Sequence, residues 1–174
     1  MPLPSTMTPI ATSTLTGNQQ SITFSSIPNT YTDLVISLVS VTTGSNYLTA
    51  IQFNTDNALP VSGTNYSATW IYGNGTSAAS SRQSSAGHSI LENQGNNSTN
   101  PNQFIINIMS YANTNTYKTV LTRNANATAV TYATVGLWRN TAAINQFTLI
   151  PDTTTGRNYF TTGTTITLYG IKAA

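Results

Sequence analysis

The sequence predicts an all-β protein: an antiparallel β-sandwich of jelly-roll-like type with about 8 to 11 short strands. Three observations support it. Apolar and polar residues alternate with a period of two in many short runs, and turns rich in Gly, Pro and Asn separate these runs. A third is that no stretch shows the 3.6-residue period and caps of a helix. At 174 residues, a single domain is expected.

The clearest strand lies at the C-terminal end, over residues 165–171. Ile166 and Leu168 fall on one face, whereas threonine and tyrosine dominate the other, which is typical of a half-buried strand. Gly163 before it predicts a turn. Gly170 within it indicates a bulge or a close approach of another group to the backbone.

The remaining strands are predicted from the same alternation. They are residues 10–15, 21–24, 33–41, 48–53, 66–72, 89–92, 103–109, 117–123, 129–138 and 144–150. The run 33–41 is apolar on both faces, which predicts a central strand covered on both sides. The run 103–109 resembles a buried strand. Residues 124–127 predict a hairpin turn. The Gly/Ser/Ala-rich stretch 73–87 predicts a long exposed loop, and residues 93–102 predict a second, polar loop.

Residues 1–19 form a Pro- and Thr-rich segment in which Pro2, Pro4 and Pro9 argue against a helix. We therefore expect an extended N-terminal arm over residues 1–19, followed by a β-sandwich domain over residues 20–174. Such an arm either packs along its own domain or reaches a neighbouring molecule.

Charge is the most informative feature of the composition. Only 6% of residues are charged, and the formal net charge is +2, against about 25% charged residues in an ordinary domain. The six basic residues are scattered, which argues against nucleic acid as a partner. No apolar run approaches the ~20 residues of a membrane span, and the N-terminus lacks the pattern of a signal peptide. A near-neutral polar surface suits a protein in a crowded assembly, or simply a Thr-rich β protein.

Few residues are suited to catalysis or metal binding. The chain has one His, four acidic residues and no Cys, so the usual zinc sites are not expected. His88 precedes Glu92 by four residues among many serines, but an exposed loop histidine explains it better than a Ser–His–Glu triad. Asn54, Asp56 and Asn57 offer oxygen ligands for calcium, although a turn fits them better. We expect no enzyme activity, no cofactor and no metal.

Three aromatic residues are candidates for an interface. Trp70, Tyr72 and Trp138 lie at strand ends beside polar loops, where aromatic rings stack on sugars or anchor a partner. The alternative, which is the more common one for such residues, is that these aromatic side chains pack in the core. The remaining candidates for an interface belong to the N-terminal segment: Pro2, Pro4, Met7 and Pro9.

Several segments resemble a family of tailed-phage virion proteins. Residues 160–174, F-T-T-G-T-T-I-T-L-Y-G-I-K-A-A, resemble its closing "G-S-T-F-x-L-Y-G-I-K-A" strand. Residues 21–34 resemble its "F-x-x-I-P-x-x-Y-x-D-L" stretch, and residues 51–54 its "I-x-F-N" strand. Residues 111–119 and 137–144 resemble its "Y-A-N-x-x-x-x-K-T" and "W-x-x-x-x-x-I" segments.

This resemblance implies a β-sandwich component of the virion with no catalytic motif. The expected function is that of a capsid decoration, or cement, protein that bridges neighbouring major capsid subunits on the outer shell. Its expected partners are the major capsid protein and copies of itself, a trimer included, with neither nucleic acid nor membrane. The alternative is a tail-fibre or baseplate module that binds host glycan. A secreted jelly-roll enzyme acting on carbohydrate would need paired carboxylates, for which Asp56 and Glu92 are the candidates.

Overall fold

The computed structural model describes residues 6–44, 48–56, 61–92, 100–126, 130–151 and 158–172. Within these residues every regular element is a β-strand, so the predicted all-β class is confirmed. The strands are β1 (Met7–Thr14), β2 (Ile22–Phe24), β3 (Asp33–Ser40), β4 (Thr49–Phe53), β5 (Tyr66–Gly73), β6 (Ala78–Ala86), β7 (Ser89–Glu92), β8 (Asn102–Met109), β9 (Lys118–Asn126), β10 (Val130–Trp138), β11 (Phe147–Ile150) and β12 (Thr165–Ile171).

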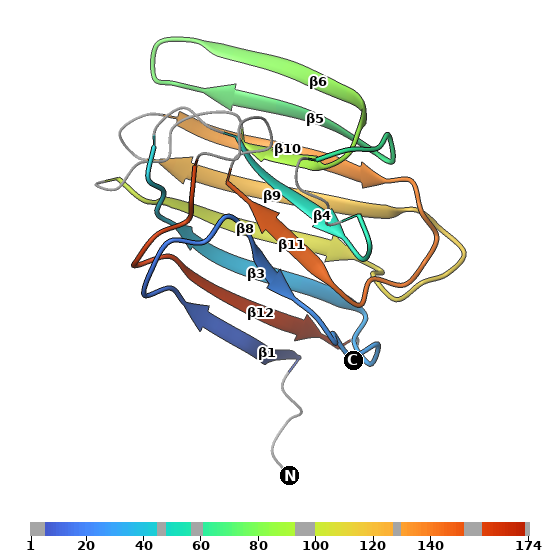
Figure 1. Ribbon diagram of the computed structural model, residues 1–174. Coiled ribbons are helices and arrows are strands. Elements are labelled where there is room, and N and C mark those ends of the chain that lie inside the picture. Colours follow the sequence, from blue (N-terminus) through green and yellow to red (C-terminus); the bar gives the residue numbers. More distant parts are fainter. Residues whose placement is uncertain are drawn as a thin grey trace.

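The strands form two antiparallel sheets of unequal size. The large sheet has eight strands in the order β1-β12-β3-β8-β9-β10-β5-β6, and the small sheet has four in the order β2-β11-β4-β7. The small sheet lies across one face of the large sheet (Figure 1). The result is a sandwich in which the described residues leave one broad face of the large sheet uncovered, whereas the jelly-roll subtype stays a prediction.

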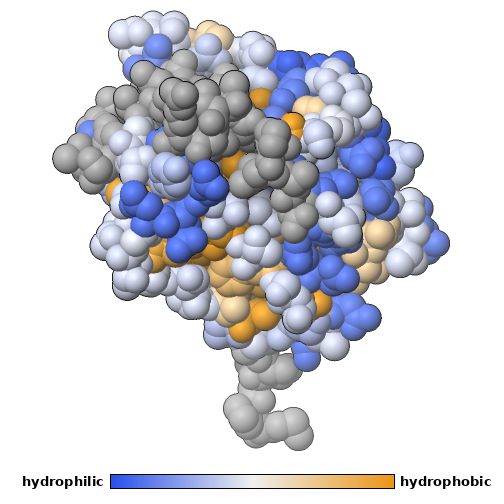
Figure 2. Space-filling view, viewed as in Figure 1, coloured by the Kyte–Doolittle hydropathy of each residue, from blue (hydrophilic) through white to orange (hydrophobic). Residues whose placement is uncertain are grey.

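The core lies between the sheets and follows from period-two alternation. In β3, Leu34, Ile36 and Leu38 have no exposed surface, and the residues between them are half-buried. From the small sheet, Phe53 and Phe147 enter the same cluster. Burial of these side chains supplies the main driving force for folding. Figure 2, seen from the side of the small sheet, shows a mostly polar surface with apolar residues gathered in its lower half.

One end of the core is built from stacked aromatic rings. Trp138 packs on Phe53 and on Tyr66, with ring centroids 5.4 Å and 6.4 Å apart. The Tyr66 hydroxyl accepts a hydrogen bond of 2.8 Å from the Phe53 amide, and the Trp138 Nε1–H donates one of 2.8 Å to Asp56 Oδ2. Each buried polar group of this cluster is thus paired, as burial requires.

The expectation that β3 is covered on both faces is wrong. The strand is central, between β12 and β8, but only its Leu34 face meets the core. Val35 and Val39 lie on the other face and are half-buried. Apolar residues on both faces therefore reflect an uncovered but partly apolar sheet surface. The strand β8, predicted as buried, behaves in the same way, because Ile105 and Met109 point outward.

The expectation of a loop over residues 73–87 is also wrong, because most of this stretch is β6. The strand pairs with β5 from Gly73↔Ala78 to Tyr66↔Ala86. Its residues are Ala, Ser, Arg and Gln, and most of them are exposed, whichever face of the strand they lie on. The sequence therefore shows no apolar alternation that would indicate a strand. This strand explains why the described residues form twelve strands rather than the predicted 8 to 11.

The N-terminal segment takes one of its two expected placements over residues 7–14. This stretch is β1, which pairs along its length with β12 and so packs against its own domain. The remainder of the predicted turn and strand positions mostly agree with the structure. The turn expected at residues 124–127 is an exception, since residues 124–126 continue β9. Gly170 marks a close approach, as predicted, because a Cβ there would overlap the Tyr31 ring.

Candidate functional site

The outer face of the large sheet carries an unusual set of exposed apolar side chains. Ile71, Leu121 and Val135 are 62%, 40% and 51% exposed, and Met109 at the rim is 42% exposed. They come from four adjacent strands: β5, β9, β10 and β8. Monomeric soluble proteins rarely expose several large apolar residues together, so such a patch marks a surface that meets a partner.

Strand register brings these residues side by side. Val135 stands opposite Leu121 in the β10–β9 pair, and Ile71 stands opposite Ala133 in the β10–β5 pair. Side chains directly opposite on one face of an antiparallel pair lie about 5 Å apart at their Cβ atoms. The apolar residues therefore form one continuous surface, which we call the outer patch: Ile71, Ala133, Val135, Leu121 and Met109.

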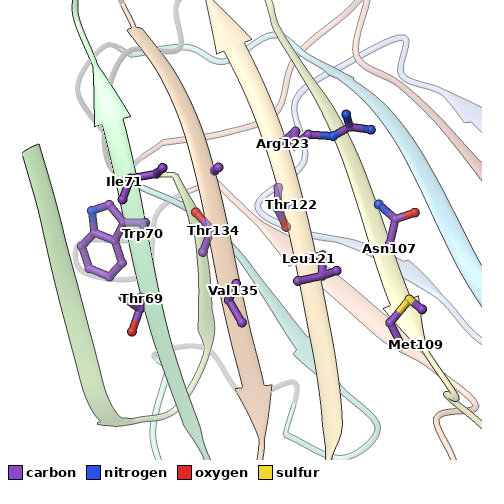
Figure 3. Close-up of a pocket in the computed structure, with 11 residues that line it drawn as sticks. Thr69, Trp70, Ile71, Asn107, Met109, Leu121, Thr122, Arg123, Thr134 and Val135 are labelled. Atoms are coloured by element: carbon purple, nitrogen blue, oxygen red, sulfur yellow. The ribbon is translucent and has the colours of Figure 1, made fainter. Parts of the chain in front are cut away.

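The outer patch is hollowed. A depression of about 650 Å³ lies over β5, β10, β9 and β8, and it includes Thr69 and Asn107 besides the apolar residues (Figure 3). A second depression of about 660 Å³ continues over β5 and β6 as far as Ser80. Arg123 borders both. The large sheet thus offers an extended shallow surface rather than an enclosed cavity.

The charge on this surface is positive. Arg123 is exposed on β9, and no described residue forms an ion pair or hydrogen bond with its guanidinium group. Arg82 on β6 stands opposite Thr69, which places it on the same outer face. The acid at the rim, Asp33, already accepts a hydrogen bond of 2.6 Å from the Ser110 amide. A partner would therefore meet apolar side chains beside two cations.

Other basic residues stabilise the fold itself. The Lys118 Nζ donates to the carbonyl oxygens of Thr116 and Thr141, at 2.9 Å and 3.0 Å. Burial lowers the pKa of Lys118, since desolvation disfavours the charged amine. Arg139 donates to backbone carbonyls in the β5 region, including that of Tyr66 at 2.9 Å. These cations are engaged inside the domain, unlike Arg123 and Arg82.

His88 is not the exposed loop histidine that we expected. It is only 8% exposed, and burial lowers its pKa to about 4. Its Nε2 lies 3.2 Å from Gln83 Nε2, and its Nδ1 has no partner among the described residues. The Glu92 side chain lies outside the described residues, so that part of the triad hypothesis is untested. No described serine is hydrogen-bonded to His88, and the local environment suits a neutral, structural imidazole.

Two of the three residues considered for calcium, Asn54 and Asp56, form hydrogen bonds within the fold instead. The Asn54 amide nitrogen donates to the Ala143 carbonyl, and its Oδ1 accepts from the Asn145 amide. Asp56 is occupied by Trp138. Asn57 lies outside the described residues. Among the described residues, no group of three His, Asp or Glu side chains is arranged to hold a metal ion.

The structure places the predicted interface residues in different environments. Met7 is 43% exposed and Pro9 is exposed, both on the edge strand β1, so both are accessible to a partner. Pro2 and Pro4 lie outside the described residues. Trp138, at 1% exposure, is part of the core and does not present its ring to a ligand.

The other two aromatic candidates also pack inward. Trp70 is 6% exposed and belongs to a small second core with Val130 and Ile90. Tyr72 is half-buried and stacks on Tyr132 at a centroid distance of 5.2 Å. The packing alternative therefore describes these aromatics, and the outer patch lies on the opposite face of the same strands.

Sequence reasoning missed the outer patch because β9 has a mostly polar inner face. In β9, Thr122 and Asn124 are buried while Leu121 and Arg123 face outward. A signal did exist: Val120 and Leu121 are adjacent, and alternation forces one of them to face solvent.

Comparison with known proteins adds no family assignment. No protein-family model matches this chain, and no curated protein matches it. Over the part of the chain that the structure describes, there is no helix long and apolar enough to cross a membrane.

Proposed function

We propose that this protein is a non-enzymatic structural component of a phage virion, a decoration protein that binds the outer capsid shell through the outer patch and bridges neighbouring major capsid subunits. The single observation that carries the binding role is the uncovered apolar face around Ile71, Leu121 and Val135. The virion assignment rests on the sequence resemblance, with its closing strand at residues 165–171.

Two further features support a binding role over a catalytic one. The described titratable side chains are dispersed: Asp33 and Asp56 are held by Ser110 and Trp138, and His88 is buried. Acid–base catalysis needs such groups together at one accessible place. The near-absence of surface charge also reduces repulsion between many copies held at high local concentration.

The chemistry of the face indicates the partner surface that it fits. Arg123 and Arg82 flank apolar residues and have no described acid to pair with. We therefore expect a capsid surface that carries apolar side chains with carboxylates beside them. Each contact would be modest, and binding at many equivalent sites of one shell would make the total attachment strong.

The first experiment measures copy number in purified particles by quantitative mass spectrometry. We expect a ratio to the major capsid protein near one, or a simple fraction of it. A few copies per particle would contradict the decoration role and place the protein in the tail.

The second experiment tests the surface. Leu121→Asn should reduce binding to shells that lack the protein, since it puts an amide at the centre of the outer patch. The matched control is Tyr117→Asn, because Tyr117 is 54% exposed but lies outside the patch. Equal binding by the two variants would refute the patch as the contact surface.

A second candidate function is glycan binding by a tail module. The hollow over β5, β10, β9 and β8 favours it, because Thr69, Asn107 and Arg123 bring polar groups beside apolar ones. The aromatic rings that first suggested glycan binding pack inward, which argues against stacking on a sugar. Adsorption to host cells that survives Asn107→Ala and Arg123→Ala would exclude this role.

A further inference from the structure

We infer that two copies of this chain associate edge to edge, with β6 of one pairing antiparallel to β6 of the other about a two-fold axis. The two large sheets would thereby join into one continuous sheet. This inference goes beyond the proposed function, since it concerns the contact between copies and holds wherever the protein acts. It is carried by the exposure, composition and register of β6.

The strand β6 is an open edge. Among the described residues it pairs with β5 alone, so its other side has no strand neighbour. An edge strand presents unpaired N–H and C=O groups that template pairing with another strand. In Figure 1, β6 lies at one end of the large sheet, beyond the strands that the small sheet covers.

The usual protections of an edge are weak here. Natural proteins block edges with proline, charge, short length or a bulge. β6 spans nine residues, A-A-S-S-R-Q-S-S-A, with no proline and one charge, Arg82. Its bulge, where Ser85 has a φ of 54°, is confined to the C-terminal end. The stretch from Ala78 to Gln83 is regular and bears mostly small side chains.

The opposite edge of the same sheet is protected. There β1 carries Pro9, which lacks an N–H, and its pairing with β12 shifts register between Pro9 and Ala11. Both edges belong to one sheet, but only β6 combines length, regularity and small residues. This difference selects β6, and not β1, as the edge that pairs.

A two-fold axis restricts the register. It keeps each side chain on its own face of the sheet, so residues that stand opposite must differ by an even number within a regular strand. An axis at Arg82 would place the two Arg82 side chains opposite each other, which is unfavourable. An axis at Gln83 would draw in the bulge around Ser85.

The axis at Ser81 avoids both problems. It pairs Ser81 with itself, Ser80 with Arg82, Ala79 with Gln83 and Ala78 with Ser84 of the other copy. Small side chains face each other or face one longer chain, which leaves room on both surfaces of the joined sheet. The depression that reaches Ser80 would continue across the junction.

A second copy is the occupant that the surface favours. A two-fold contact requires a surface complementary to itself, and strand backbone is self-complementary in antiparallel pairing. The net charge of +2 opposes such an approach only weakly. The contact buries only one strand edge, so we expect a weak dimer whose population rises with protein concentration, as on a crowded shell.

The test is a pair of opposite charge substitutions at one exposed position, read by sedimentation equilibrium. Ser80→Glu would place a carboxylate opposite Arg82 of the other copy in two symmetric places, and Ser80→Lys would place an ammonium there. We expect the dimer dissociation constant to fall between about 2- and 30-fold with Glu and to rise by a similar factor with Lys. The chain's own fold, followed by thermal melting of dilute protein, should be unaffected.

A cross-link fixes the register. The chain has no cysteine, so Ser81→Cys under mild oxidation should yield a disulfide-linked dimer, whereas the control Thr12→Cys on β1 should not. A wild-type protein that stays monomeric over the whole accessible concentration range would overturn the inference. So would equal shifts for the two Ser80 variants, or cross-linking through Thr12→Cys in place of Ser81→Cys.

Discussion

The two ends of the large sheet differ in what lies on them. Between β3 and β10, the small sheet covers the inner face, and Leu34, Ile36 and Phe104 are fully buried. At the other end, β7 is the last strand of the small sheet, and β6 beyond it packs mainly against β5. The same backbone hydrogen bonding runs through both ends, but β6 itself is exposed on both faces and buries almost no apolar area.

This comparison separates the part of the molecule that stabilises the fold from the part that meets partners. Hydrophobic stabilisation scales with the apolar area removed from water, so it is concentrated under the small sheet. The strand β6 adds little such area. A strand that contributes little to stability is free to present its edge and its face to other molecules.

The largest expected effect is at the covered end. Trp138→Ala should lower the free energy of unfolding by about 3–5 kcal/mol, since it leaves a cavity beside Phe53 and removes the donor to Asp56. Urea denaturation of the dilute protein measures it.

The matched control is Ile71→Ala, which removes an apolar side chain that is 62% exposed. We expect a change within about 0.5 kcal/mol. Comparable losses for the two variants would contradict the division between the covered and the exposed parts.

The second prediction concerns His88, which lies where β6 passes into the covered strand β7. Its pKa is lowered from 6.5 to about 4 by burial, so between these pH values the unfolded chain binds more protons than the folded one. Stability should therefore be unaffected by this group above pH 6.5, and should fall by up to about 3 kcal/mol as the pH is lowered to 4.

Unfolding free energies across this pH range measure the effect. His88→Gln should flatten the slope while leaving the contributions of the carboxylates in place. If the variant kept the wild-type slope between pH 6.5 and 4, the titration would belong to other groups.

The third prediction compares two glycines. Gly170→Ala should reduce stability by about 1–3 kcal/mol, because the added methyl group overlaps the Tyr31 ring. Gly17→Ala meets no atom within 4 Å, and it should leave stability unchanged or raise it by up to about 1 kcal/mol through the unfolded state. Thermal melts of both variants give the comparison, and a neutral Gly170→Ala would show that Tyr31 moves aside freely.

The sequence predicts the covered end well and the exposed end poorly, for a physical reason. Where one face of a strand is buried, apolar residues recur at every second position, as Ile166 and Leu168 do in β12. β6 buries almost nothing, so its Ala and Ser residues carry no pattern, and the stretch resembles a loop. Only its pairing with β5 identifies it as a strand.

The candidate site was missed for a related reason. Trp70 and Trp138 were candidates for an interface because they are aromatic residues near polar loops. Whether an aromatic ring points into the core or toward solvent depends, however, on which face of the sheet is covered. That is a property of two sheets packed together, and no single strand encodes it. The outer patch depends in the same way on the register of β10 with β5 and β9, which places Val135 beside Leu121.

A small effect on stability is expected from the turn that closes the β5–β6 hairpin. Asn74 Oδ1 accepts hydrogen bonds from the amides of Thr76 and Ser77, at 3.1 Å and 2.8 Å, and Gly75 supplies a φ of 87°. Asn74→Ala removes these bonds and should lower the free energy of unfolding by only about 1 kcal/mol or less, because the turn is exposed.

Asn74→Ala should destabilise the β5–β6 hairpin more than it destabilises the whole fold. This contrast tests the comparison between the covered and the exposed end directly. Hydrogen exchange of the β6 amides should accelerate in Asn74→Ala, because the hairpin opens without unfolding the core, while the β3 amides keep their protection. If the β6 amides exchanged only together with the β3 amides, the hairpin would be part of the cooperative core. The exposed end would then not be an independent surface, and an edge that pairs with a second copy would have to form at some cost to the fold's stability.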